Sequence, residues 1–118
     1  MKISVVRKHA LAMEATTEEP HHDYSSFRVR GKIFVTIPPG EAFIHVFVGE
    51  EDRARALAMY PEFIEKLMWG SKALGLRVAL DQAEPSVVKA LVTRAYETRV
   101  AKDAGPKRAR SAGKAGTA

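Results

Sequence analysis

Cysteine is absent from the 118-residue chain, and none of its apolar segments is long. Without cysteine there can be no disulfide, no zinc site with cysteine ligands and no thiol nucleophile. No apolar run approaches the roughly 18–20 residues that a membrane helix requires. The first nine residues are charged where a signal peptide would be apolar. We therefore expect a cytoplasmic protein without a membrane partner.

Positive charge is concentrated at one end of the chain. The formal net charge is +5, from 19 basic and 14 acidic side chains. Residues 102–118 contain five basic side chains and one acidic one, so the net charge of residues 1–101 is only +1. The tail has too little apolar area to offset its ordering entropy. We expect one domain over 1–101 and a disordered basic tail over 102–118, which either solubilises the protein or attracts nucleic acid.

The spacing of apolar residues predicts an α+β domain. Apolar residues three and four positions apart predict helices over 3–13, 53–60 and 85–101, and a further helical turn over 63–68. Alternating apolar residues predict strands over 27–37 with a bend at Gly31, over 42–48 and over 76–81. The polar segment 14–23 is predicted to be a loop. Because short turns join consecutive strands, we expect an antiparallel sheet with the N-terminal and C-terminal helices packed on it.

Three segments of the sequence resemble proteins of the MmcQ/YjbR family. They are residues 10–13, 17–21 and 26–34, and the last of them has the pattern Phe-x-Val-x-Gly-Lys-x-Phe. The resemblance covers about residues 3–101. It implies a frataxin-like, double-wing α+β fold, and a DNA-binding label that rests on this shape. It supplies no catalytic motif.

The best nucleic-acid candidate is the set of cations Arg28, Arg30 and Lys32, at alternate positions of the predicted hairpin. On one strand face they would lie about 6–7 Å apart, a spacing similar to that of successive phosphates. Arg77 and Lys72 are candidates to extend this surface. The alternative is a solvated face whose charges discourage edge pairing. With three to five phosphate contacts, the logarithm of the binding constant would fall with the logarithm of the salt concentration with a slope of roughly −3 to −4.5. We therefore expect weak, mainly nonspecific DNA binding.

Three other features have alternative interpretations. His21, His22 and Asp23 are metal-ligand types, but adjacent residues rarely converge on one ion, so we expect a solvated loop with no metal and no cofactor. His45 is either a hydrogen-bonded structural histidine or a titrating functional one. Trp69, the only tryptophan, either packs in the core or at its rim, or offers a stacking platform for a base.

The sequence contains no serine elbow, no Gly-rich phosphate loop and no carboxylate pair suited to catalysis, so we do not expect an enzyme. Our first hypothesis is a small MmcQ/YjbR-like binding protein that contacts DNA weakly through the basic hairpin face. The alternative is a protein-interaction or small-ligand module without a nucleic-acid role. In that case the sheet face or the region around Trp69 would dock the partner, and an exposed apolar patch would favour it.

Overall fold

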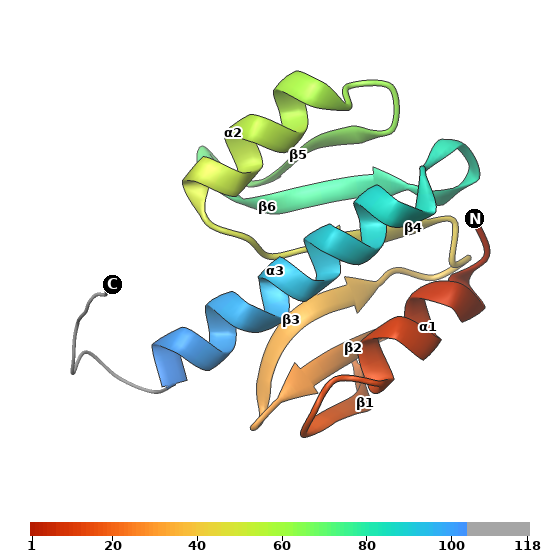
Figure 1. The fold of residues 1–118 in the computed structure, drawn as a ribbon, viewed down its shortest axis with the longest axis vertical. Helices are drawn as coiled ribbons and strands as arrows, with labels where there is room; N and C mark the ends of the chain where they lie inside the picture. Colours follow the sequence, from red (N-terminus) through yellow and green to blue (C-terminus); the bar gives the residue numbers. More distant parts are fainter. Residues whose placement is uncertain (104–118) are drawn as a thin grey trace.

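The computed structural model describes residues 1–103, which form an antiparallel sheet of six strands and three α-helices (Figure 1). In chain order the elements are α1 (Ile3–Leu11), β1 (Thr16–His21), β2 (Tyr24–Val29), β3 (Lys32–Ile37), β4 (Phe43–Val46), α2 (Glu50–Met59), β5 (Ile64–Trp69), β6 (Lys72–Ala79), a 3-10 turn (Leu80–Gln82) and α3 (Pro85–Asp103). The strand order across the sheet is β1-β2-β3-β4-β6-β5. The predicted α+β class, with an antiparallel sheet and packed terminal helices, is confirmed.

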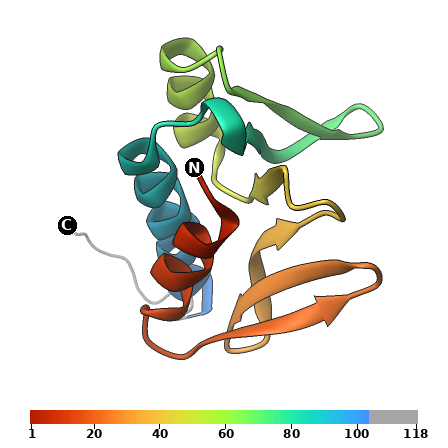
Figure 2. The same ribbon diagram turned by 90° about the vertical axis from the view of Figure 1, so that its right-hand side faces the viewer.

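The core lies between the sheet and the helices, which all cover the same face (Figure 2). Directly paired residues of β2, β3, β4 and β6 form a fully buried row across this face, made of Phe27, Val35, Val46 and Leu76. The helices α1 and α3 add buried side chains to it, Val6, Ala10, Val88, Val92 and Ala95. Each large apolar side chain buried here stabilises the fold by about 1.5–3 kcal/mol.

The opposite face of the sheet, here called the open face, carries a polar row. The residues next to the buried row are Ser26, Thr36, His45 and Arg77, and they pair directly across the same four strands. Because successive strand residues point to opposite sides, this row faces away from the helices. Ser26, Thr36 and His45 are nevertheless buried. Other parts of the protein must therefore shield this row from water.

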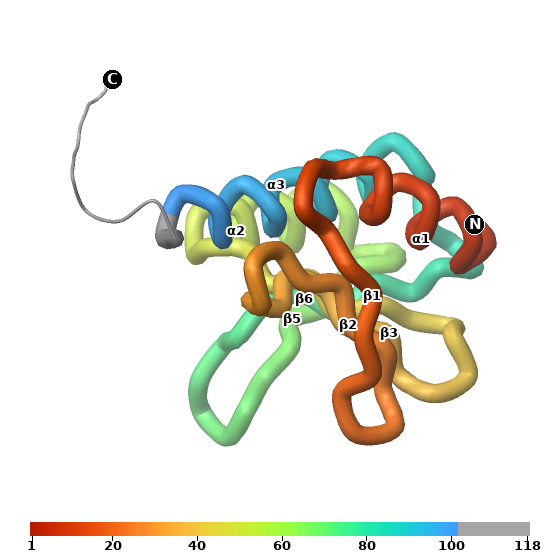
Figure 3. The backbone as a smooth tube through the Cα atoms, turned by 90° about the horizontal axis from the view of Figure 1, so that it is seen from below, coloured from red at the N-terminus to blue at the C-terminus, as the bar shows by residue number. Residues whose placement is uncertain are grey.

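Two hairpins project from the sheet on the same side as this row, away from the helices (Figure 3). The β1–β2 hairpin reverses direction between the paired residues His21 and Tyr24. The β5–β6 hairpin does so between Trp69 and Lys72. Both turns are two residues long, so the ends of the strands remain paired up to the tips.

Two predicted elements are wrong. The segment predicted as a loop over 14–23 contains β1, which is the outer strand of the sheet. An edge strand tolerates polar side chains and Pro20, because its outer side has no ladder to complete. The predicted helical turn over 63–68 lies in β5, and β6 starts at Lys72 rather than at Leu76. A short apolar run fits either period, so spacing alone did not separate the two states.

The remaining differences are at element boundaries. The structure ends α1 at Leu11, places α2 over Glu50–Met59, extends α3 to Asp103 and confines β4 to Phe43–Val46. From residue 104 onward, the predicted disordered tail lies outside the described residues. Among residues 1–103, no helix combines the length and the apolar character needed to cross a bilayer.

Candidate functional site

A cleft of about 580 Å³ lies on the open face between the two projecting hairpins. Residues 21–24, at the tip of the β1–β2 hairpin, form one wall. The β5–β6 hairpin forms the other, with Leu67, Met68, Trp69 and Leu74, while Thr36, His45 and Phe47 come from the central strands and the segment after β4. We call this the inter-hairpin cleft. Its size is typical of sites that hold small molecules.

The wall formed by the β5–β6 hairpin exposes large apolar side chains. Trp69 is 76% exposed, and Met68 and Leu74 are 45% and 41% exposed. Of the alternatives for Trp69, burial in the core is therefore not what the structure has. Three exposed apolar side chains on one hairpin, next to a concave surface, are typical of a binding site.

The central part of the cleft is polar and buried. His45 is 9% exposed, and its Nε2 atom is buried without a hydrogen-bond partner in the described part of the chain. The ring of Tyr24 lies over it from the β1–β2 hairpin, with 6.0 Å between the ring centroids. Burial lowers the pKa of His45, and the positive charge of Arg77 lowers this pKa further. The imidazole is therefore neutral at pH 7, with one nitrogen as donor and the other as acceptor.

The predicted basic strip is not formed as expected. Val29 and Lys32 pair across a two-residue turn, so their side chains share the helix-covered face. Arg28 precedes the buried Val29 and therefore lies on the open face. Arg30 is in the turn itself, with φ 52°, followed by Gly31 at φ 80°. The expectation that three cations share one face is wrong, because alternation does not continue through a reversal of the chain. Nucleic-acid binding by these residues stays a prediction.

The two arginines on the open face already have partners within the protein. The guanidinium of Arg28 donates from Nε to Ser26 Oγ at 3.0 Å and from Nη2 to the Pro20 carbonyl at 3.1 Å. Arg77 lies with its Cζ 4.0 Å from the centroid of the Phe43 ring, and its Nε is 3.8 Å from Glu65 Oε2. Both cations are thus oriented by the sheet, and Arg77 is partly neutralised by Glu65.

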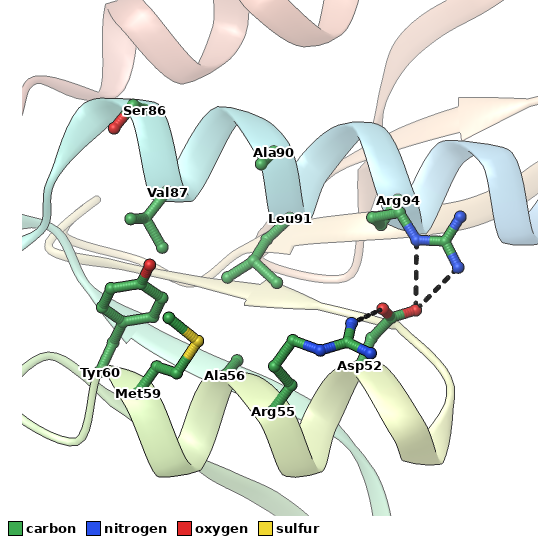
Figure 4. A pocket seen from close by; sticks show the side chains of 10 residues that line it. All are labelled: Asp52, Arg55, Ala56, Met59, Tyr60, Ser86, Val87, Ala90, Leu91 and Arg94. Atoms are coloured by element: carbon green, nitrogen blue, oxygen red, sulfur yellow. Dashed lines mark hydrogen bonds and ion pairs between the residues drawn. The ribbon is translucent and has the colours of Figure 1, made fainter.

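A smaller hollow of about 350 Å³ lies between α2 and α3 (Figure 4). At one end, Asp52 accepts a hydrogen bond from Arg55 at 3.3 Å and another from Arg94 Nη2 at 3.1 Å. This interaction raises the pKa of Arg94. Met59, 57% exposed, lies toward the other end of the hollow. Since its charged groups satisfy one another, this hollow has less need of a ligand than the inter-hairpin cleft.

The histidines at the tip of the β1–β2 hairpin contact each other with their rings tilted by 59°. The rings of His21 and His22 are 4.8 Å apart, measured between centroids. Within residues 1–103, no group of three or more His, Asp or Glu side chains could hold a metal ion. Both histidines line the inter-hairpin cleft.

Comparison with known proteins adds a family assignment. A family model described as YjbR matches residues 11–98, which include every strand of the sheet and most of α3. The chain belongs to the YjbR family. The resemblance predicted from residues 10–34 is thus confirmed for the YjbR family, whereas a search of curated proteins finds no match.

Sequence reasoning missed most of the inter-hairpin cleft because it recognised neither the β1–β2 hairpin nor the β5–β6 hairpin. Tyr24, Met68 and Leu74 were not candidate residues, although all three line the cleft. One signal could have found the β5–β6 hairpin. Gly70-Ser71 between two apolar segments is a two-residue hairpin turn, and this interpretation would have placed Trp69 at a projecting tip.

Proposed function

We propose that this YjbR chain is a non-enzymatic binding protein whose ligand site is the inter-hairpin cleft. The observation that carries the proposal is the 76% exposure of Trp69 beside a cleft of about 580 Å³. Exposed Trp, Met and Leu side chains have few protein contacts to give up when a ligand binds. Burial of their apolar area by the ligand is favourable in free energy. The site thus fits the small-ligand or protein-interaction alternative.

The side chains of the cleft support binding better than catalysis. Nucleophilic catalysis needs a hydroxyl that donates a hydrogen bond to a nearby base. In the described residues, Thr36 and His45 pair across the sheet, yet their side chains share no hydrogen bond. We therefore retain the expectation that the protein is not an enzyme.

Weak nucleic-acid binding is a second candidate function, favoured by the common position of Arg28 and Arg77 on the open face with the exposed Trp69. The two hairpins would then act as the wings that the family resemblance implies. With two to four phosphate contacts, the salt slope would be roughly −2 to −4. Titration of the full chain with a fluorescent duplex at low salt tests it. Equal binding by the protein and by its Arg28→Ala, Arg77→Ala double variant would remove this candidate.

The cleft proposal can be tested with N-phenyl-1-naphthylamine, a neutral apolar dye that fluoresces strongly on leaving water. We expect saturable enhancement with the unaltered protein and at least about fivefold weaker binding by Trp69→Ala, since a stacking aromatic contributes about 1–3 kcal/mol. The matched control is Met59→Ala, which removes an exposed apolar side chain from the α2–α3 hollow. An equal loss in both variants, or no saturable binding by the unaltered protein, would contradict the proposal.

A further inference from the structure

The buried His45 identifies the part of the inter-hairpin cleft that requires a polar partner. Its side chain is more than nine-tenths buried, and its Nε2 atom has no hydrogen-bond partner in residues 1–103. Buried polar atoms in proteins are hydrogen-bonded in the large majority of cases, and an unpaired one is costly. An unpaired nitrogen beside a cleft is therefore a position where a ligand atom would be stabilised.

The chemical state of His45 restricts what that ligand atom can be. A neutral imidazole has one donor and one acceptor nitrogen, so Nε2 is a donor in one tautomer and an acceptor in the other. A hydroxyl group both donates and accepts, so it can pair with Nε2 in either tautomer. The hydroxyl of Thr36, which pairs with His45 across β3 and β4, adds a second polar group to the same part of the cleft.

The walls of the cleft restrict the rest of the ligand. Neither lysine nor arginine is among the residues that line it, and Asp23 at the rim is the one carboxylate there. A phosphate or carboxylate ligand would find no lysine or arginine as a countercharge within the cleft. Aromatic and thioether side chains face the space from both hairpins, with Tyr24 on one and Met68 and Trp69 on the other. Such groups favour a flat ring through stacking and sulfur–aromatic contacts.

We propose that the inter-hairpin cleft binds a neutral aromatic molecule with a hydroxyl group, its ring held between the two hairpins and its hydroxyl bonded to His45 Nε2. The inference rests on the proposed function, because it specifies the ligand of the same site. Nε2 is shielded from solvent in the free protein, and the Tyr24 ring lies 6.0 Å from the His45 ring. Binding therefore requires a local movement of the side chains that cover Nε2.

Two probes of nearly equal shape separate the two parts of the proposal. 2-Naphthol carries the hydroxyl, and 2-fluoronaphthalene has a fluorine in its place, which cannot donate. Each is titrated into the full-length ¹⁵N-labelled protein, with amide shifts of residues 21–24 and 67–74 as the readout. We expect both probes to shift these amides and 2-naphthol to bind about three- to tenfold more tightly, as one hydrogen bond to a neutral group provides.

The possible outcomes distinguish the ligand class from the site. Equal affinities of the two probes at the cleft would overturn the hydroxyl assignment and leave the cleft as a binding site. Absence of shifts with either probe would overturn both proposals. His45→Phe keeps a ring in place and should abolish the preference for 2-naphthol without weakening 2-fluoronaphthalene. Should this variant not fold, the comparison of the two probes on the unaltered protein decides the question alone.

Discussion

Replacement of Gly75 by alanine tests a close backbone approach beside the cleft. Gly75 lies in β6, pairs with Leu67 of β5 and follows Leu74, and both leucines line the inter-hairpin cleft. A Cβ atom added at Gly75 would overlap the carbonyl oxygen of Val46 and lie 3.2 Å from the Cα of Phe47. Both contacts are backbone atoms, so no side-chain rotation can relieve them. The strands must separate instead.

The magnitude follows from the size of this separation. Normal carbon contacts of about 3.5–4.0 Å require a shift of roughly 1 Å between β6 and the end of β4. Overpacking of this kind costs about 1–3 kcal/mol. The reduced entropy of the unfolded chain offsets about 0.4–1 kcal/mol of this. We expect a net loss of about 1–2 kcal/mol, from a total stability of roughly 5–15 kcal/mol for a domain of this length.

Thermal unfolding followed by circular dichroism measures this loss. A destabilisation of about 1–2 kcal/mol should lower the Tm by roughly 4–16 °C. The matched control is Gly49→Ser, which adds a Cβ where no atom lies within 4 Å and where φ is −71°. Serine is also a preferred N-cap residue for α2, so the Tm of this variant should be unchanged or higher. An unchanged Tm for Gly75→Ala would refute the close approach of the two strands.

Three further predictions concern charge and burial. Because the pKa of His45 is lowered from 6.5, the unfolded state binds its proton first, and stability should fall as pH drops below about 6.5, by at most about 1.4 kcal/mol per pH unit. Urea unfolding at pH 7.5 and 5.5 should show this fall, and a smaller one in His45→Phe; equal falls would exclude His45 as the cause. Glu18 accepts hydrogen bonds from Arg7 Nε at 2.8 Å and Ser25 Oγ at 2.7 Å, and the Arg7 bond is the main reason for its lowered pKa. Glu18→Gln should lower the free energy of unfolding by about 1 kcal/mol at pH 7. The difference in stability from the unaltered protein should shrink as pH falls below 4.5, and a constant difference would contradict this role of Glu18. Phe27→Ala, at a fully buried position, should cost about 3–5 kcal/mol in urea unfolding, and a cost below about 1 kcal/mol would contradict the described core.

Elements with a strong, continuous pattern could be predicted from the sequence. The apolar stripe of α3 and the alternation of β2 and β3 around Gly31 gave the correct element types, because burial of one face fixes the period. The edge strand β1 could not be recognised in this way. Its residues are mostly exposed, so no apolar pattern was required of them, and only pairing with β2 makes it a strand.

The candidate site was less predictable than the fold, since it depends on which faces the strands present. Arg28 and Lys32 lie at even spacing in the sequence, yet the turn at Arg30 and Gly31 places them on opposite faces. The cleft joins residues 21–24 to residues 67–74, about 45 positions apart in the chain. This proximity depends on the strand order β4-β6-β5, which places the β5–β6 hairpin at one edge of the sheet. The local spacing of apolar residues in the sequence does not specify that order.

The most direct test of the central claim is the measurement of intermolecular nuclear Overhauser effects between the full-length protein and bound 2-naphthol. If the inter-hairpin cleft is the ligand site, the naphthyl protons will show contacts with the indole of Trp69 and with the methyl groups of Leu74. Contacts with Met59 and Leu91 instead would move the site to the hollow between α2 and α3 and contradict the account.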